Sequence, residues 1–375
     1  MATGREIDFE SDYRQTEELS KEPLKDSDPA AIERRVADLL TAANMILPDQ
    51  PTLIKRAVSG LLAGHLILAG PPGTGKTTLA RLLAEAFNCS AHLETATADW
   101  GTYDVIGGLQ PKISQQGAIA TETIAPWHGH VVKNAIQCAR TMRKNEDNPS
   151  GHPRQAHWLI IDEFNRAEID SAIGGLYTVL GGGNEPLKLW YEQDEQRNQV
   201  WMPGRFRIIG TLNSVDTNYV YSFSQGLTRR FRYVYVGVPS KDQIEQEMNF
   251  ASTQAKEWAH NAYGVDGSKI DAATGTAAPI LSSFIVSIRY GKDSVSGWPV
   301  GTAQVVDVLK QVSLNAENGD ATENLDLAIA DLIVPQMMDL RAEQIELVER
   351  SIPSSLPRTQ NALKVLREAQ NTSFA

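Results

Sequence analysis

Up to residue 239, short apolar segments of the chain alternate with segments of helical periodicity. Apolar segments with the length and composition of buried strands occur at 65–69, 91–96, 157–162, 206–212 and 233–238. Apolar residues at intervals of three and four positions predict helices between most of them, at 77–87, 131–143 and 169–180. Strands buried in a parallel sheet are apolar almost throughout. The alternation therefore predicts an α/β fold with a doubly wound, parallel, five-stranded sheet.

The pattern differs on both sides of this region. Residues 5–29 are crowded with charged residues and offer few apolar anchors, so we predict a flexible acidic arm over 1–29. Two helices are predicted next, one starting at Ala31 and one over 51–62. After residue 239 only helical periodicity remains, and helices are predicted at 241–261, 278–290, 302–314, 324–338 and 359–369. The chain is thus predicted to hold an α/β domain over 30–239 and a helical lid domain over 240–375.

Two connections inside the α/β domain are long. Residues 102–126 contain Gly107, Gly108 and Pro126, and residues 186–203 contain two short apolar segments around a charged turn. Both patterns are typical of hairpins inserted between the regular elements.

Composition and charge narrow the class of protein. The 375 residues, 42% of them hydrophobic, suffice for two domains with a substantial core. The net charge of −11 disfavours a protein that covers nucleic acid, although a local basic patch is compatible with it. Cys89 and Cys138 lie far apart, which gives neither a disulfide framework nor a zinc motif. No apolar segment has the length of a membrane span. We expect a soluble, cytoplasmic protein.

A phosphate-binding loop follows the first predicted strand. The sequence GPPGTGKT at 70–77 matches G-x-x-x-x-G-K-[ST], in which small residues let backbone N–H groups face phosphates. The lysine reaches the β- and γ-phosphates, and the hydroxyl of Thr77 is a ligand of Mg²⁺. The residues predicted to bind a nucleotide are Gly70, Pro71, Pro72, Gly73, Thr74, Gly75, Lys76, Thr77 and Thr78.

Polar residues end two later strands. Asp162 and Glu163 end an apolar strand about 85 residues after the loop, with a strand and helices between. In this context we favour a functional role for the two carboxylates over plain solvation. Asp162 is predicted to hold Mg²⁺, and Glu163 to polarise the attacking water. Asn213 ends the next strand and is predicted to orient that water or sense the γ-phosphate.

Arg229 and Arg230 precede the last predicted strand. An arginine that stabilises charge on the γ-phosphate can come from another subunit. Since no other arginine is evident near the loop, we predict this role for Arg230 or Arg229, which implies an oligomer.

Taken together, these segments resemble the AAA+ ATPases, and more narrowly their MoxR-like and McrB-like (dynein-related) branch. The resemblance rests on 70–77, on IDEFNRA at 161–167, on IGTLNSVD at 209–216 and on RRF at 229–231, and it extends over roughly 30–345. It implies that Lys76 and Thr77 are Walker A residues, that Asp162 and Glu163 are Walker B residues, and that Asn213 is sensor 1. Either Arg230 or Arg229 would be the arginine finger. The two hairpins would be the helix-2 insert and the pre-sensor hairpin.

The sequence departs from that family at two places. Gln304 stands where MoxR-like proteins usually carry the sensor 2 arginine, and Arg289 or Arg358 would have to replace it. The step from Asn213 to Asp216 resembles the McrB-like GTPases, so both ATP and GTP remain open as the nucleotide bound with Mg²⁺.

Three functions follow from these features. The first is an ATP-hydrolysing homo-oligomer, a hexameric ring by the resemblance, that remodels or activates a protein partner. The second is an McrB-like motor subunit, driven by GTP or ATP, of a nucleic-acid-processing or anti-phage defence complex. The third is a nucleotide-gated scaffold without appreciable turnover, which the presence of Glu163 disfavours.

Other polar and aromatic residues give weaker signals. His128 and His130 have no further ligands at useful spacing, so we interpret them as packing residues rather than a metal site. The tryptophans are scattered along the sequence and do not predict a platform for stacking bases.

Overall fold

The computed structural model describes residues 16–25, 27–116, 119–148, 150–151, 154–167, 172–181, 185–195, 197–213, 224–290, 297–338, 340 and 342–373. Its contacts divide the chain into two compact units. The α/β unit comprises Met1–Ala43, Gln50–Gly70 and Lys76–Tyr235. The helical unit comprises Asn44–Asp49, Pro71–Gly75 and Val236–Ala375.

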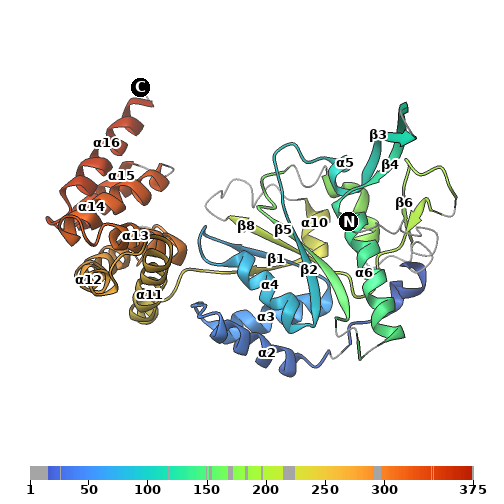
Figure 1. Cartoon of the computed structure of the whole chain (residues 1–375), viewed down its shortest axis with the longest axis horizontal. Coiled ribbons are helices and arrows are strands. Elements are labelled where there is room, and N and C mark those ends of the chain that lie inside the picture. Colours follow the sequence, from blue (N-terminus) through green and yellow to red (C-terminus); the bar gives the residue numbers. More distant parts are fainter. Residues whose placement is uncertain are drawn as a thin grey trace. The chain divides into compact units, whose positions relative to one another are not determined.

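The α/β unit is built on a parallel sheet of five strands in the order β2-β5-β8-β1-β9 (Figure 1). The strands are β1 (His65–Gly70), β2 (Cys89–Thr95), β5 (Ala156–Asp162), β8 (Ile208–Asn213) and β9 (Phe231–Tyr235). All neighbouring strands run parallel. The predicted doubly wound five-stranded sheet is therefore confirmed, and all five apolar segments contribute a strand.

Helices flank this sheet. They are α2 (Pro29–Ala42), α3 (Gln50–Ala63), α4 (Lys76–Ala86) and α6 (His130–Asp147). The apolar stripe that predicted α4 is buried, with Leu79 and Leu83 fully enclosed. Within the predicted helix over 169–180, the described residues are helical: 172–173, the 3₁₀ turn η2 (Gly174–Leu176) and α8 (Tyr177–Leu180) follow one another. Residues 168–171 lie outside the described residues.

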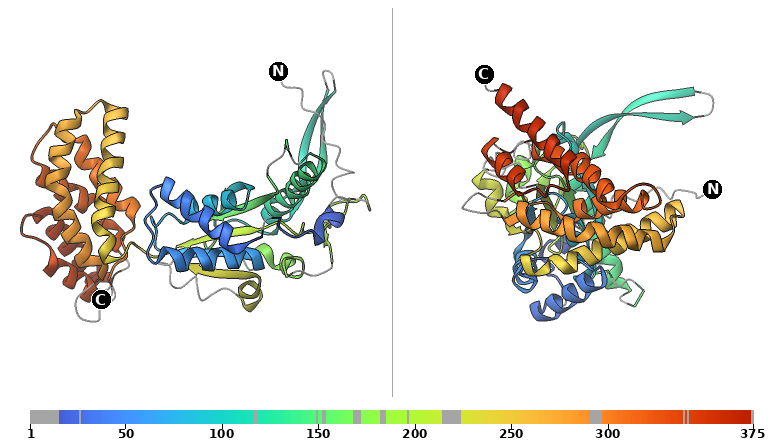
Figure 2. Two further views of the ribbon diagram at one scale, coloured as in Figure 1. Left: turned by 90° about the horizontal axis from the view of Figure 1, so that it is seen from below. Right: turned by 90° about the vertical axis from the view of Figure 1, so that its left-hand side faces the viewer.

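Antiparallel hairpins lie within both long connections. After α5 (Thr102–Val105), β3 (Gly107–Gln116) pairs with β4 (Ile119–His128) and projects from the α/β unit (Figure 2). The second hairpin is short and joins β6 (Leu187–Lys188) to β7 (Gln199–Val200). Tyr191 connects the two hairpins, because its hydroxyl donates to Ile106 O at 3.0 Å and contacts His128 Nδ1 at 3.0 Å.

The predicted flexible arm needs correction for residues 16–25. Leu19, in the 3₁₀ turn η1 (Leu19–Lys21), and Leu24 are buried. The enclosed Arg205 donates from Nε to Pro23 O at 2.7 Å, and Gln155 Oε1 accepts from the N–H of Lys25 at 2.6 Å. These few apolar and backbone contacts offset the entropic cost of ordering this charged segment. Residues 1–15 lie outside the described part.

The helical unit consists of helices after the last strand. They are η3 (Lys241–Gln243), α11 (Ile244–Tyr263), α12 (Gly267–Tyr290), α13 (Thr302–Leu314), α14 (Ala321–Leu332), η4 (Val334–Met337), α15 (Ala342–Ser351) and α16 (Pro357–Ser373). α15 has no counterpart among the predicted helices. α12 begins well before the predicted residue 278 and keeps Pro279 inside it. Its apolar composition and length would allow a membrane span, but it packs within this unit on α11, α13, α14 and α15.

Candidate functional site

The loop between β1 and α4 is shaped by its glycines. Gly73 and Gly75 have φ of 74° and 82°, left-handed values that a side chain disfavours. Pro71–Gly75 group with the helical unit, where the N–H of Ala303 donates to Gly73 O at 3.1 Å. Thr78, predicted to bind nucleotide, is exposed on α4.

Lys76 opens α4 and is buried. Its Nζ donates to Gly70 O and to Asn213 Oδ1, each at 3.0 Å. Burial lowers the pKa of Lys76 to about 8, and the carboxylates of Glu163 and Asp162 counteract part of that shift. A buried ammonium that donates to neutral oxygens can exchange them for the charged oxygens of a phosphate.

Asp162 lies at the end of β5, beside the hydroxyls of two threonines. Thr77 Oγ1 is 2.8 Å from Asp162 Oδ1. Thr211 Oγ1 donates to the same oxygen and accepts from the N–H of Glu163 at 3.2 Å. Thr211 was missed by the sequence reasoning, although its position two residues before Asn213 puts both on the same face of β8. Hydroxyl and carboxylate oxygens of this kind are the ligands that Mg²⁺ prefers.

Glu163 is held in a left-handed backbone conformation, with φ of 55°. Asn213 Nδ2 lies 2.9 Å from both carboxylate oxygens of Glu163, and Arg166 Nε lies 3.1 Å from Glu163 Oε2. The strand register explains this meeting, because Gly70 pairs with Asn213 and β5 pairs with β8. Lys76, Thr77, Asp162, Glu163 and Asn213 therefore gather at the carboxyl edge of the sheet.

Arg229 and Arg230 lie at the opposite side of the same sheet, where the strands begin, and this side is called the amino edge below. They end α10 (Gln225–Arg230), and the next residue, Phe231, pairs with His65 at the start of β1. The five residue steps from His65 to Gly70 span about 16 Å at the usual rise of a strand. The structure therefore separates both arginines from the carboxyl-edge residues of their own chain.

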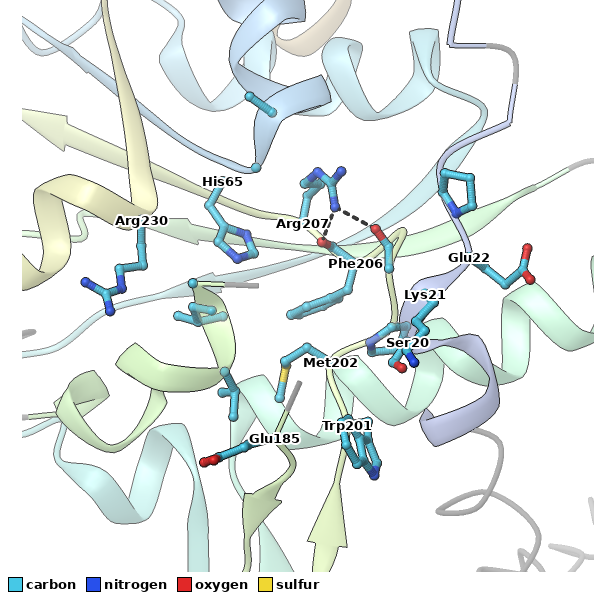
Figure 3. Close-up of a pocket in the computed structure, with 18 of the residues that line it drawn as sticks. Ser20, Lys21, Glu22, His65, Glu185, Trp201, Met202, Phe206, Arg207 and Arg230 are labelled. Atoms are coloured by element: carbon cyan, nitrogen blue, oxygen red, sulfur yellow. Dashed lines mark hydrogen bonds between the residues drawn. The ribbon is translucent and has the colours of Figure 1, made fainter. Parts of the chain in front are cut away.

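A cavity of about 410 Å³ lies at this amino edge (Figure 3). Its lining includes His65, Phe206, Arg207, Arg229 and Arg230, together with residues 20–23. Burial, and to a smaller extent Arg207, lowers the pKa of His65 to about 3, so its ring is neutral. His65 Nδ1 accepts from the N–H of Ile208 at 3.0 Å. The cavity shares none of the predicted phosphate-binding residues.

The candidates for sensor 2 are all engaged inside the helical unit. Arg289 Nη1 and Nη2 donate to the two oxygens of Glu247 at 2.6 and 2.8 Å, and both side chains are fully enclosed. Arg358 Nη2 donates to Glu323 Oε1 at 2.6 Å. Gln304 Oε1 accepts from the N–H of Gly301 at 2.5 Å and so caps α13. Asp216, which resembled the McrB-like GTPases, lies outside the described residues.

The histidines and tryptophans near the first hairpin form packing contacts. His130 Nδ1 lies 3.1 Å from Glu94 Oε1, and no group of three potential metal ligands occurs within the described ranges. Trp127 stacks on Tyr103 with centroids 4.9 Å apart, and Trp100 stacks on His130 at the same distance. The tryptophans scattered in sequence are thus partly gathered in space, which the sequence did not predict.

Part of the chain is similar to a known protein family. Residues 65–231 match the model of the AAA domain (dynein-related subfamily). None of the curated proteins matches the sequence. Three mutant structures of Thermotoga maritima RuvB are 13%, 13% and 14% identical, with TM-scores of 0.38, 0.39 and 0.38. Each alignment covers 85% of this chain and 87% or 88% of the RuvB chain. A likeness this distant carries no conclusion about function.

Proposed function

We propose, starting from the match of residues 65–231 to the AAA domain (dynein-related subfamily), that this chain is an oligomeric nucleoside triphosphatase. One observation carries the proposal. Five predicted site residues meet at the carboxyl edge of the sheet, and both predicted arginines lie at its amino edge. Such a chain holds most of one site and can donate an arginine to the site of another copy.

The roles of the carboxyl-edge residues follow from their chemistry. Lys76 binds the β- and γ-phosphates, with the N–H groups of 70–77 around them. Thr77 and Asp162 would hold Mg²⁺, which neutralises the charge that develops on the phosphates. Glu163 accepts a proton from the attacking water, and Asn213 orients that water. Because Asn213 and Arg166 now bond the Glu163 carboxylate, one of these contacts must open to admit the water.

The proposed assembly is a homo-oligomer, and its proposed partner is a protein client. A homo-oligomer places Arg230 at the neighbouring phosphate site, and a hexameric ring is the arrangement implied by the family resemblance. A protein client is favoured by the net charge of −11 and by the exposed apolar side chains of the first hairpin. Leu109, Ile113 and Ile124 there are 45%, 71% and 73% exposed. Cys89 and Cys138 are free thiols, which suits the cytoplasm.

A subunit-mixing experiment tests the shared site. Lys76→Ala removes the phosphate ligand but leaves Arg230, whereas Arg230→Ala does the reverse. We expect each variant alone to be inactive with ATP and Mg²⁺, and their mixture to recover activity at the composite sites. An Arg230→Ala variant that hydrolyses ATP at the native rate, or a chain that stays monomeric with ATP and Mg²⁺, would contradict the proposal.

The second candidate function is a GTP- or ATP-driven motor of a nucleic-acid-processing complex. The resemblance to the McrB-like branch favours it, and the acidic charge opposes it. Hydrolysis of ATP and GTP measured with and without DNA, at 50 and 200 mM salt, separates the two. Stimulation by DNA that falls steeply with salt would favour this second function, because phosphate contacts weaken as salt rises.

A further inference from the structure

We propose that Tyr177 is the positioning residue that fixes Arg230 for the neighbouring site. The inference rests on the proposed function, since it concerns the arginine donated between subunits. α10, which ends in Arg230, has only six residues. A helix this short is unstable by itself. The place of its last residue is therefore set by what packs against it.

Tyr177 contacts both ends of α10. Its carbonyl oxygen accepts from Arg230 Nε at 2.9 Å, and its ring centroid lies 5.6 Å from the guanidinium carbon. At the other end, its hydroxyl is 3.1 Å from Ser224 Oγ. Ser224 is the N-cap of α10 and accepts from the N–H of Leu227 at 3.2 Å. One residue thus touches the cap that starts the helix and the arginine that ends it.

The middle of α10 also lies against the Tyr177 ring. A methyl group added at Gly226 would come within 3.0 Å of Tyr177 Cε2. The carbonyl oxygen of Gly226 accepts from Arg230 Nη1 at 3.1 Å. The absence of a side chain at Gly226 therefore lets the ring approach the helix closely, and the same turn of backbone holds the guanidinium.

These contacts leave a defined part of Arg230 available. Nε and Nη1 are bound to the carbonyls of Tyr177 and Gly226, while no described residue hydrogen-bonds Nη2. The side chain of Arg229, by contrast, is exposed and forms no hydrogen bond or ion pair with the described residues. A guanidinium fixed by two nitrogens loses little freedom when it binds a phosphate oxygen. This arrangement selects Arg230 of the pair, positioned by Tyr177.

The first test compares two substitutions in the full-length chain. Tyr177→Ala removes the ring and the hydroxyl, and we expect kcat for ATP to fall on the order of 10²-fold, the cost of a misplaced catalytic group. Tyr177→Phe keeps the ring and the carbonyl contact, and we expect a loss of about fivefold or less, the effect of one neutral hydrogen bond. The dissociation constant for ATP should stay native in both, because the chain's own phosphate site is untouched.

Mixing distinguishes positioning from general damage. In Tyr177→Ala the phosphate site is intact and only the donated arginine is misplaced. Adding Lys76→Ala subunits, which donate a native Arg230, should restore hydrolysis. The double variant Tyr177→Ala with Arg230→Ala should be no slower than Arg230→Ala alone, because residues that act through one group are not additive.

Each outcome decides between the hypotheses. If Arg230→Ala is impaired but Tyr177→Ala keeps native kcat, or if added Lys76→Ala subunits rescue nothing, Tyr177 does not position the arginine. If Arg230→Ala itself keeps native kcat, the proposed function fails instead. Should Tyr177→Ala not fold, Gly226→Ala tests the same contact by pushing the ring away. It should lower kcat without changing ATP binding, and native kcat there would overturn the inference.

Discussion

Each unit contains a buried cation, Arg289 in the helical unit and Lys76 in the α/β unit, and the two have different surroundings. Arg289 in the helical unit donates Nε to Val300 O at 2.7 Å and both remaining nitrogens to Glu247, which also accepts from Thr302. Lys76 in the α/β unit donates to the neutral oxygens of Gly70 and Asn213. A buried charge alone therefore does not indicate a ligand site.

The partners of each buried cation decide whether it can bind a phosphate. The Arg289 guanidinium forms a bidentate pair with a carboxylate, so a phosphate would have to displace a charged partner that then stayed buried. Lys76 lies next to a glycine-rich turn at the ends of parallel strands, and burial lowers its pKa to about 8. A phosphate there replaces neutral acceptors and stabilises the protonated form of the lysine. This contrast favours a structural role for Arg289 over the role of sensor 2.

The largest effect should come from the carboxyl edge. Glu163→Gln removes the proton acceptor while keeping the size of the side chain, and we expect hydrolysis to fall by ~10² to 10⁴-fold. Nucleotide binding should remain. The exposed Glu185, at the amino-edge cavity, offers the matched control Glu185→Gln, which should keep the native rate. Equal rates for the two variants would remove Glu163 from the mechanism.

The second effect concerns the helical unit. Arg289→Met leaves Glu247 buried without its partner and should lower the free energy of unfolding by about 3–5 kcal/mol. Combining it with Glu247→Leu should recover much of that loss. Arg358→Met breaks an exposed pair with Glu323 and should cost about 0–1 kcal/mol. Urea unfolding measures the stability of the two single variants and the double variant. If Arg289→Met is as stable as the native protein, the Arg289–Glu247 pair does not stabilise the helical unit.

The third effect depends on pH. In the nucleotide-free protein Lys76 loses its proton as pH rises through about 8. Binding of nucleotide should therefore weaken by up to about tenfold per pH unit above 8 and take up a proton there. Calorimetry in buffers of different ionisation enthalpy detects that uptake. Lys76→Arg stays charged over this range, so any residual binding it shows should not vary with pH. If the affinity of the native protein for the nucleotide stays the same between pH 7 and 9.5, Lys76 is not the phosphate ligand with the lowered pKa.

The smallest effect tests Gln304. If this side chain only caps α13, Gln304→Ala should lower stability by about 1 kcal/mol and leave KM for ATP unchanged. A marked rise in KM without a change in stability would instead place Gln304 at the nucleotide. That result would weaken the contrast between the structural helical unit and the ligand-binding α/β unit.

Much of the fold was predictable because its signals are local. Strands such as Ala156–Asp162 are continuously apolar, and the G-x-x-x-x-G-K-T pattern itself marks the junction between β1 and α4. The site residues that follow these strands were predictable for the same reason. The end of a buried strand can be located from its apolar run, and parallel pairing brings the ends of neighbouring strands together. Side-chain contacts cannot be located in this way.

The rest depends on contacts between distant segments. Residues 16–25 are ordered by Arg205 and Gln155, more than a hundred positions away, so their polar composition was misleading. α12 starts before Pro279 because Ile270, Ala273 and Ala277 face the core of the helical unit. Thr211 gains its place only when β8 lies beside β5. No sequence pattern pointed to Tyr177, because its inferred role depends on its contacts with α10 in the folded chain.

The first hairpin exposes apolar side chains and also limits aggregation through its strand edges. Leu109, Ile113 and Ile124 lie on the same side of the β3–β4 ribbon by register. A two-stranded ribbon has two open edges, each of which invites another chain to add a strand. Pro111 in β3 and Pro126 in β4 remove one N–H from each strand, and a ladder cannot run uninterrupted past a proline. The hairpin can thus offer side chains to a partner while its backbone resists templating an aggregate.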